Sequence, residues 1–399
     1  MNALRRLRWV VGILAVAWLW GCGGGSPDVP GSGSPAGAPT SKGSFTAVVS
    51  FGDSLSDAGA YAPATSLAGN GQAPYFGGRF TTNDNTTTTN LVWVEYLAAH
   101  LGIALTPAEV GFAGSSVKCP FAAVPQLANS CTAYGQGGAL VTNANGYHHA
   151  AGLLTVPVKT QIANHLARFS SFKESDLILV FAGNNDVFVQ FEAFAASAAQ
   201  IQADAAAGRI TPDQANTLLL NAELTVLGAM KQAALELAGY VRDEILAKGG
   251  KYVAVMTLVD IADTPFGNSA QVAPARSVLS ALSENFNLWL REGLTDQPVQ
   301  LIDAWSLFKD VYQNPGKYGI ANNTVPACDA AKIQVVTGGA VTDGGSLFCS
   351  ATAGAPYNGI RTGADIHTWF FADSVHPSTG GHMLFEQAVR AQLSAFGWI

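Results

Sequence analysis

Charged side chains are scarce in this 399-residue sequence, where Lys, Arg, Asp and Glu together make up 12%. Beyond the first ten residues there is no basic cluster, and the formal net charge is −7. Nucleic-acid binding is therefore disfavoured, because neutralising phosphates needs a concentrated face of lysine and arginine. Hydrophobic residues make up 48%, which is ample for the core of one large domain or two ordinary ones.

The N-terminal apolar run, Val10–Trp20, is too short to span a membrane as a helix. Three arginines precede it, so it indicates an export signal. The run ends in Leu19–Cys22, which resembles the lipobox of bacterial lipoproteins, although Trp20 stands where a small residue is usual. We expect residues 1–21 to be a lipoprotein-type signal peptide and Cys22 to carry the lipid. An ordinary secretory signal is the alternative, and either one predicts export: a membrane-anchored periplasmic or surface protein, or a secreted one.

Cysteine is rare, with five residues in the whole chain. If Cys22 carries lipid, four remain, and they allow three pairings. The local pairs, Cys119–Cys131 and Cys328–Cys349, close short polar loops and are the ones we expect. Disulfides require an oxidising compartment, which agrees with export. A zinc site is the alternative for four cysteines, but no Cys-x-x-Cys spacing occurs.

Residues 22–44 are rich in Gly, Ser and Pro and predict a flexible tether, which leaves residues 45–399 as one domain. Continuous apolar runs in this domain predict strands that are covered on both faces. Segments with helical periodicity lie between these runs, and this alternation is typical of a parallel sheet with helices on both sides. The predicted strands are Phe45–Phe51, Leu177–Ala182, Lys251–Leu258 and Val299–Ile302, with a weaker one near Ile103–Val110; the predicted helices include Leu91–His100, Val156–Phe169 and one or two helices between a capping box at Thr211–Gln214 and Gly249.

Polar clusters follow two of the predicted strands. Gly52-Asp53-Ser54 comes directly after the first strand, and Gly183-Asn184-Asn185-Asp186 comes after the Leu177–Ala182 strand. Because ligands of parallel sheets bind at the carboxyl ends of strands, these clusters predict a site at that edge.

Three residues in this sequence have the chemistry of a nucleophilic triad. A serine hydroxyl needs a base within hydrogen-bond reach and donors for the oxyanion that develops on the attacked carbonyl. Ser54 is a candidate nucleophile, and Asp373-Ser374-Val375-His376 brings an acid and an imidazole three residues apart. Asp373 would then fix the tautomer of His376, whose other ring nitrogen faces the serine. The alternatives are that Ser54 only caps a helix and that His376 is a loop histidine.

Four blocks of the sequence resemble, in family order, those of the GDSL or SGNH hydrolases. They are Phe51–Asp57, Tyr134–Ala139, Gly183–Asp186 and Asp373–His376. The glycine block departs from the family pattern Asn-Tyr-Ala-x-Gly-Gly-Ala, because Ala133 replaces its asparagine and Gly135 its alanine. Other candidate segments are Gly111–Gly114, a rival glycine block, and Gly78–Phe80 and Val92–Leu97, which resemble segments of lipase-like members.

This resemblance implies a fold and a set of roles. The fold would be an α/β/α sandwich of three layers with a parallel, flavodoxin-like sheet. Ser54 would be the nucleophile, His376 the general base and Asp373 its partner. The oxyanion hole would take the N–H of Ser54, the N–H of Gly138, with Gly137 as the alternative, and the side-chain amide of Asn185. No metal or organic cofactor is expected.

Two classes of function follow from these motifs. The first is a carboxylic ester hydrolase, an esterase or lipase acting through an acyl-enzyme on an acyl lipid or a small ester. Carbohydrate O-acetyl esterases, phospholipases and acyltransferases of the same fold are alternatives within this class. The second class is a surface lipoprotein that binds without catalysis. No His-Glu-x-x-His and no Gly-x-Ser-x-Gly occurs, so zinc proteases and the usual α/β-hydrolase elbow are excluded on motif.

Overall fold

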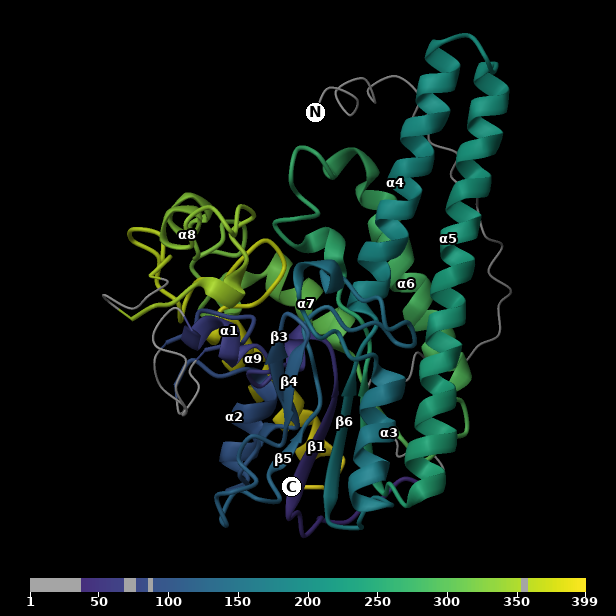
Figure 1. Ribbon diagram of the computed structural model, residues 1–399. Helices are drawn as coiled ribbons and strands as arrows, with labels where there is room; N and C mark the ends of the chain where they lie inside the picture. Colours follow the sequence, from purple (N-terminus) through teal and green to yellow (C-terminus); the bar gives the residue numbers. More distant parts are fainter. Residues whose placement is uncertain (1–36, 68–76, 85–88, 353–357) are drawn as a thin grey trace.

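A six-stranded parallel sheet forms the centre of the protein in the computed structural model, which describes residues 37–67, 77–84, 89–352 and 358–399 (Figure 1). The strand order is β2-β5-β1-β6-β7-β8. Without the two-residue edge strand β2, this is the flavodoxin-like order that the resemblance implied. The strands are β1 (Ala47–Gly52), β2 (Thr106–Pro107), β5 (Cys131–Ala133), β6 (Asp176–Phe181), β7 (Tyr252–Met256) and β8 (Gln300–Ile302).

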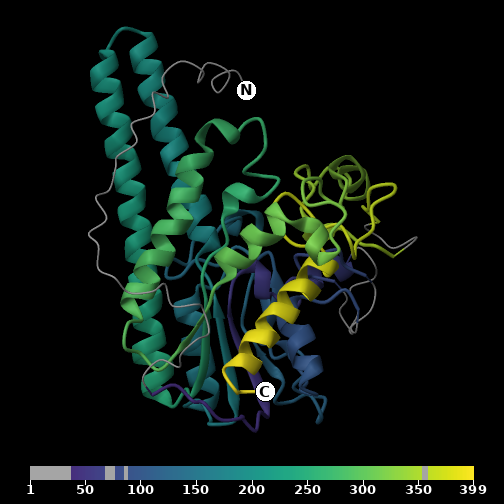
Figure 2. The ribbon, with the colours of Figure 1, turned by 180° about the vertical axis from the view of Figure 1, so that it is seen from behind.

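Helices cover both faces of the sheet, which confirms the predicted three-layer architecture (Figures 1 and 2). On one face α2 packs against α9, where the ring of Phe385 lies 5.1 Å from that of Trp93 and 5.5 Å from that of Phe181. On the other face α3 contacts β1 and α5. The helices are α1 (Ala62–Leu67), α2 (Trp93–His100), α3 (Val158–Phe169), α4 (Asn184–Ala206), α5 (Pro212–Tyr240), α6 (Arg276–Gly293), α7 (Ala304–Gln313), α8 (Ala330–Val336) and α9 (Thr379–Ala395).

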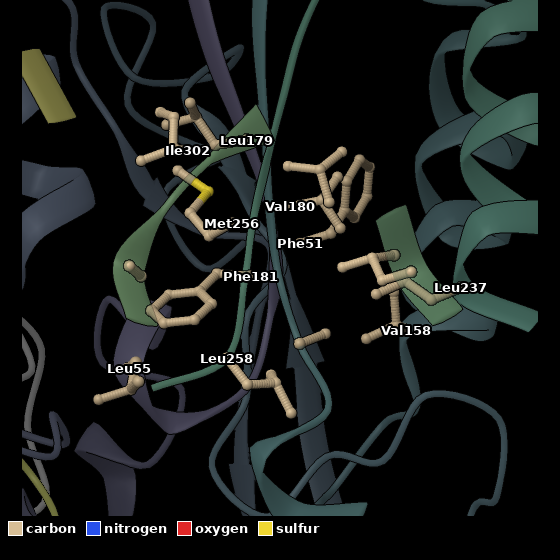
Figure 3. Packing of buried hydrophobic residues seen from close by; sticks show 14 of the residues in the cluster. Phe51, Leu55, Val158, Leu179, Val180, Phe181, Leu237, Met256, Leu258 and Ile302 are labelled. Carbon is tan, nitrogen blue, oxygen red and sulfur yellow. The ribbon is translucent and has the colours of Figure 1, made fainter. Parts of the chain in front are cut away.

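Successive residues of the central strands point to opposite sides of the sheet. Figure 3 shows Val180 on the side of α3 and α5, and its neighbours Leu179 and Phe181 on the other side. Every residue of β6 and β7 is buried, as the continuous apolar runs predicted. Burial of both faces of the sheet therefore stabilises the fold, and the polar loops lie at the ends of the strands.

Two strands differ from the expectation. The segment near Ile103–Val110 divides into β2 and a separate β3 (Glu109–Phe112), which pairs antiparallel with β4 (Ser115–Lys118). Strand β5 was not predicted, because its three residues include Thr132 and form no apolar run. It nevertheless lies next to β1 and extends the sheet toward the glycine block.

The expected capping box opens a single long helix. Thr211 accepts a hydrogen bond from the N–H of Gln214, whose side chain accepts one from the N–H of Thr211. Helix α5 passes through Gly228 and Gly239 without a break, and a π turn and a 3₁₀ turn then lead to Gly249. Together α4 and α5 form a hairpin that projects beyond the carboxyl end of the sheet (Figure 1).

Part of the predicted tether lies against the domain. The indole N–H of Trp398 donates to the carbonyl of Pro39 at 2.7 Å, and the hydroxyl of Tyr252 donates to the carbonyl of Ser41 at 3.3 Å. Packed chain therefore begins upstream of residue 45. The predicted signal peptide and Cys22 lie outside the described residues. None of the described helices is long and apolar enough to cross a membrane.

His165 is buried in an aromatic cluster on the α3 face. Its ring stacks on Phe172 at 4.3 Å, and among the described residues neither ring nitrogen has a hydrogen-bond partner. Burial, helped by the charges of Arg168 and Lys173, lowers the pKa of His165 from 6.5 to about 4. The unfolded chain takes up this proton near pH 6.5, so the folded state loses stability as the pH falls from 6.5 towards 4.

We expect His165→Phe to stabilise the protein and to reduce its acid sensitivity. At pH 7.5 the gain should be about 1–2 kcal/mol, because two unpartnered ring nitrogens are removed from the core. At pH 5 the gain should grow by a further ~2 kcal/mol, since the variant no longer loses stability through this titration. Urea unfolding at the two pH values measures both effects. An equal gain at both pH values for His165→Phe would contradict the titration argument.

Candidate active site

Ser54 follows β1 on a sharp turn. The strand ends at Gly52, and Ser54–Ser56 forms a 3₁₀ turn whose N-cap is Asp53. One carboxylate oxygen of Asp53 accepts from the N–H of Leu55 at 3.1 Å. The capping role thus belongs to Asp53, and the hydroxyl of Ser54 is left to make a different contact.

That contact is with His376, which is 322 residues away in the sequence. The Nε2 atom of His376 lies 2.8 Å from Oγ of Ser54, and its Nδ1 atom lies 2.8 and 3.0 Å from the two carboxylate oxygens of Asp373. The backbone N–H groups of Val375 and His376 also donate to Asp373, at 2.9 and 2.7 Å. Burial raises the pKa of Asp373, but the charge of His376 and these hydrogen bonds outweigh it, so the net pKa falls well below its ordinary value. An ionised Asp373 favours the tautomer with a proton on Nδ1, which leaves Nε2 free to accept the serine proton.

A disulfide-closed loop supplies a further donor to Asp373. The N–H of Ser346 donates to Oδ2 of Asp373 at 2.8 Å, and Ser346 lies inside the loop that the Cys328–Cys349 disulfide closes. The other disulfide joins Cys119 to Cys131. The structure therefore contains the two local pairs that the sequence led us to expect, and these four cysteines do not form a zinc site.

The glycine block presents a backbone N–H near the serine turn. Gly138 has φ of +80°, and a Cβ there would lie 2.1 Å from the carbonyl oxygen of Tyr147, so only glycine fits. The N–H of Gly137 donates to Asp57 at 2.9 Å. Among the described residues, the N–H groups of Ser54 and Gly138 have no acceptor. Between the two glycines, Gly138 is thus the one with a donor available for an oxyanion.

The departure of this block from the family pattern has a steric reason. A Cβ at Gly135 would lie 2.7 Å from the carbonyl oxygen of Ser56, so the alanine of the pattern does not fit against this turn. The rival block, Gly111–Gly114, belongs to the β3–β4 ribbon, where the N–H of Gly111 donates to the carbonyl of Ala60. The backbone of this rival block is therefore already engaged, by strand pairing and by the hydrogen bond to Ala60.

Asn185 ties the third block to the glycine block. It lies in the first turn of α4, and its Nδ2 atom donates to the carbonyl of Ala139 at 3.1 Å. The preceding Asn184 donates to Asp53 at 3.0 Å and so reaches the serine turn. All the predicted site residues of the four blocks consequently meet at one edge of the sheet, around the carboxyl ends of β1 and β6.

Three residues that support this site were not assigned a role from the sequence. Both oxygens of Asp57 are bound by backbone N–H groups, including that of Gly137. The side-chain amide of Gln161 accepts from the N–H of Gly52 at 2.9 Å and donates to its carbonyl at 2.8 Å. The ring of Phe80 packs 4.9 Å from that of His376. Asp57 and Phe80 lie in Phe51–Asp57 and Gly78–Phe80, two segments that resemble the family, so the sequence did contain a signal for them. Nothing in the sequence marks Gln161.

Buried carboxyl groups surround the nucleophile. Burial raises the pKa of Asp53 to about 6, against the opposing effects of Asn184, Leu55 and His376. It raises the pKa of Asp57 and of Asp186 to about 7. Asp186 accepts from the N–H of Val141 at 3.1 Å and so joins the first turn of α4 to the segment that follows the glycine block. The surroundings of the serine turn are therefore strongly desolvated.

Comparison with known proteins agrees with this geometry. The family model described as GDSL-like Lipase/Acylhydrolase matches residues 48–389 and so includes every one of the four blocks. No curated protein matches the sequence significantly. The match covers well over half of the chain, and the chain therefore belongs to the GDSL-like lipase/acylhydrolase family of hydrolases acting on ester bonds.

Proposed function

We propose that this protein is a serine-dependent carboxylic ester hydrolase that works through an acyl-enzyme. The observation that carries this proposal is the hydrogen-bonded chain from Ser54 through His376 to Asp373, with distances of 2.8 Å at both links. A binding protein has no need for a hydroxyl aligned with an imidazole and a buried carboxylate. The family match supports ester hydrolysis in general.

In the acylation step, Oγ of Ser54 attacks the ester carbonyl carbon while its proton passes to Nε2 of His376. The negative charge that develops on the carbonyl oxygen is stabilised by the N–H groups of Ser54 and Gly138 and by the amide of Asn185. The bond to the alcohol then breaks, and Nε2 returns the proton to the departing oxygen. Asp373 stabilises the imidazolium that exists between these two transfers.

In the deacylation step, water takes the place of the alcohol. It loses a proton to His376 and attacks the acyl carbonyl, the bond to Oγ breaks, and Nε2 returns the proton to Ser54. The products are the free acid and the regenerated enzyme. Transfer to a second alcohol in place of water would make the protein an acyltransferase without any change in these residues.

A fluorophosphonate probe tests this proposal directly. We expect one probe per protein, attached to the peptide that contains Ser54, because the probe phosphonylates an activated serine with loss of fluoride and ordinary serines do not react. Intact-mass and peptide mass spectrometry measure the stoichiometry and the position. Heat-denatured protein is the control and should stay unlabelled. A folded protein that stays unlabelled would favour the second class, a lipoprotein that binds without catalysis.

We also propose that the protein is exported and anchored to a membrane through a lipid on Cys22. The sequence Leu19–Cys22 supports the lipid, and the two disulfides support an oxidising compartment. The mass of the mature N-terminal peptide distinguishes a lipidated Cys22 from an ordinary secretory cleavage.

A further inference from the structure

Three segments of the candidate active site each have an aromatic side chain next to them. These segments are the glycine block, the first turn of α4 and the turn that holds Asp373 and His376. Tyr147 is fixed to the glycine block, because its N–H donates to the carbonyl of Gly138 at 2.8 Å. Phe188 lies in α4 three residues after Asn185, on the same side of the helix. Phe266 is fixed to the acid–base turn through its N–H, which donates to the carbonyl of Ser374 at 2.8 Å.

These three side chains form one continuous surface, which we call the aromatic wall (Tyr147, Phe188 and Phe266). The ring of Phe188 stacks on that of Tyr147 at 5.5 Å and meets that of Phe266 edge-on, also at 5.5 Å. All three side chains are only half-buried. The buried Phe191 lies behind them, 6.1 Å from Phe266. The aromatic wall therefore packs on a buried ring and keeps part of its own surface accessible.

Charges near the wall do not favour an anionic substrate. The hydroxyl of Tyr147 donates to Glu192 at 2.8 Å, which places a carboxylate at one end of the wall. Three cations on segments around the site are already neutralised by carboxylates: Arg79 by Glu95, Lys309 by Asp260 and Asp263, and Arg276 by Asp263. A phosphate-bearing headgroup would thus meet no unpaired cation at these positions.

We propose that the aromatic wall binds the acyl chain of an uncharged ester, so that medium-chain acyl groups are preferred over acetyl. This inference rests on the proposed function. The wall is attached to Gly138 and lies one helical turn from Asn185, the proposed oxyanion donors, which contact the acyl carbonyl. Its half-exposed rings offer apolar area to the chain that leaves this carbonyl, and each methylene buried there stabilises the transition state.

The test is a series of p-nitrophenyl esters from acetyl to octanoyl. For the unaltered protein we expect kcat/KM to rise about threefold per methylene while the chain covers the wall. In Phe188→Ala, the ratio of octanoyl to acetyl kcat/KM should fall about tenfold, as expected when a contact side chain is truncated. Phe266→Leu, which keeps apolar volume and loses the ring, should lower the ratio less and covers the case in which Phe188→Ala does not fold.

The matched control is Phe169→Ala. Phe169 is also half-buried, but it is the last residue of α3. This helix runs away from the carboxyl ends of the strands, where the site lies (Figure 1). This control should keep the ratio of the unaltered protein. Equal rates for all chain lengths, or a ratio unchanged in both wall variants, would overturn the proposal and direct attention to the apolar pocket between Leu55 and Val375. Failure of the proposed function would look different, because every ester would then be hydrolysed as fast by Ser54→Ala as by the unaltered protein.

Discussion

Replacing Ser54 by alanine is expected to lower kcat/KM for p-nitrophenyl acetate by at least about 10⁴-fold. The variant lacks the oxygen that forms the acyl-enzyme, and only the oxyanion donors and substrate binding remain to accelerate the reaction. Stability should change little, by less than about 1 kcal/mol, because Asp53 rather than Ser54 caps the turn. Steady-state kinetics with the thermal unfolding midpoint measures both quantities.

Ser56 provides the matched control for this substitution. It lies in the same turn and is buried, but its hydroxyl accepts a hydrogen bond from the indole N–H of Trp93 at 3.2 Å. Ser56→Ala should therefore lower the unfolding midpoint and leave most of the activity. The reverse pattern, with activity lost in Ser56→Ala and kept in Ser54→Ala, would show that the nucleophile had been wrongly assigned.

The sequence was sufficient to predict the sheet because its central strands are buried on both faces. Such strands need continuous apolar runs, as in Leu177–Ala182, and these runs are visible without any structure. Strand β5, next to the edge strand β2, was missed for the opposite reason. It is three residues long and is held by its place between β1 and β2, which no local pattern records.

The same distinction applies to the site. Its four blocks are local motifs, so short stretches of sequence were enough to name Ser54, Asn185, Asp373 and His376 as candidates. The groups that hold these residues in place come from elsewhere in the chain. Gln161 reaches Gly52 across 109 residues, and the Ser346 N–H reaches Asp373 from a disulfide-closed loop. Such contacts depend on the folded path of the chain, and a single sequence does not contain their signal.

Helix α5 shows how packing overrides local propensity. Glycine inside a helix costs up to ~1 kcal/mol relative to alanine, so Gly228 and Gly239 suggested a break. The helix instead runs without interruption against α4 and α6. A Cβ at Gly228 would meet nothing within 4 Å, so this glycine is not needed for close packing. The buried face of α5, including Met230, Ala234 and Leu237, stabilises the helix by more than the two glycines cost.

Asp373→Asn is the second substitution with a large expected effect, about 10³–10⁴-fold in kcat at pH 7. Oδ1 of Asp373 accepts from two backbone N–H groups, so the amide oxygen of the asparagine would take that position. The amide NH₂ would then replace Oδ2, where it faces the Ser346 N–H and Nδ1 of His376. A donor facing Nδ1 favours the tautomer with the proton on Nε2, and this nitrogen can no longer accept the proton of Ser54.

The same substitution should also destabilise the fold at neutral pH. The pKa of Asp373 lies below its unfolded value, so its carboxylate contributes stability above pH 3.8 that is lost as the pH falls through the folded pKa. Asn cannot supply this pH-dependent stabilisation. The difference in unfolding free energy between the unaltered protein and Asp373→Asn should therefore shrink in acid. Asp365→Asn is the control for the loss of activity, because this exposed carboxylate accepts from His367 and Thr368, away from the serine.

A double variant separates catalysis through Ser54 from a general effect on folding. If Asp373 acts only by orienting His376 toward the serine, Ser54→Ala combined with Asp373→Asn should be no slower than Ser54→Ala alone. The two stability changes should still add, because the destabilisation does not depend on the serine hydroxyl. A further tenfold loss of rate in the double variant would mean that Asp373 contributes to the reaction by another route.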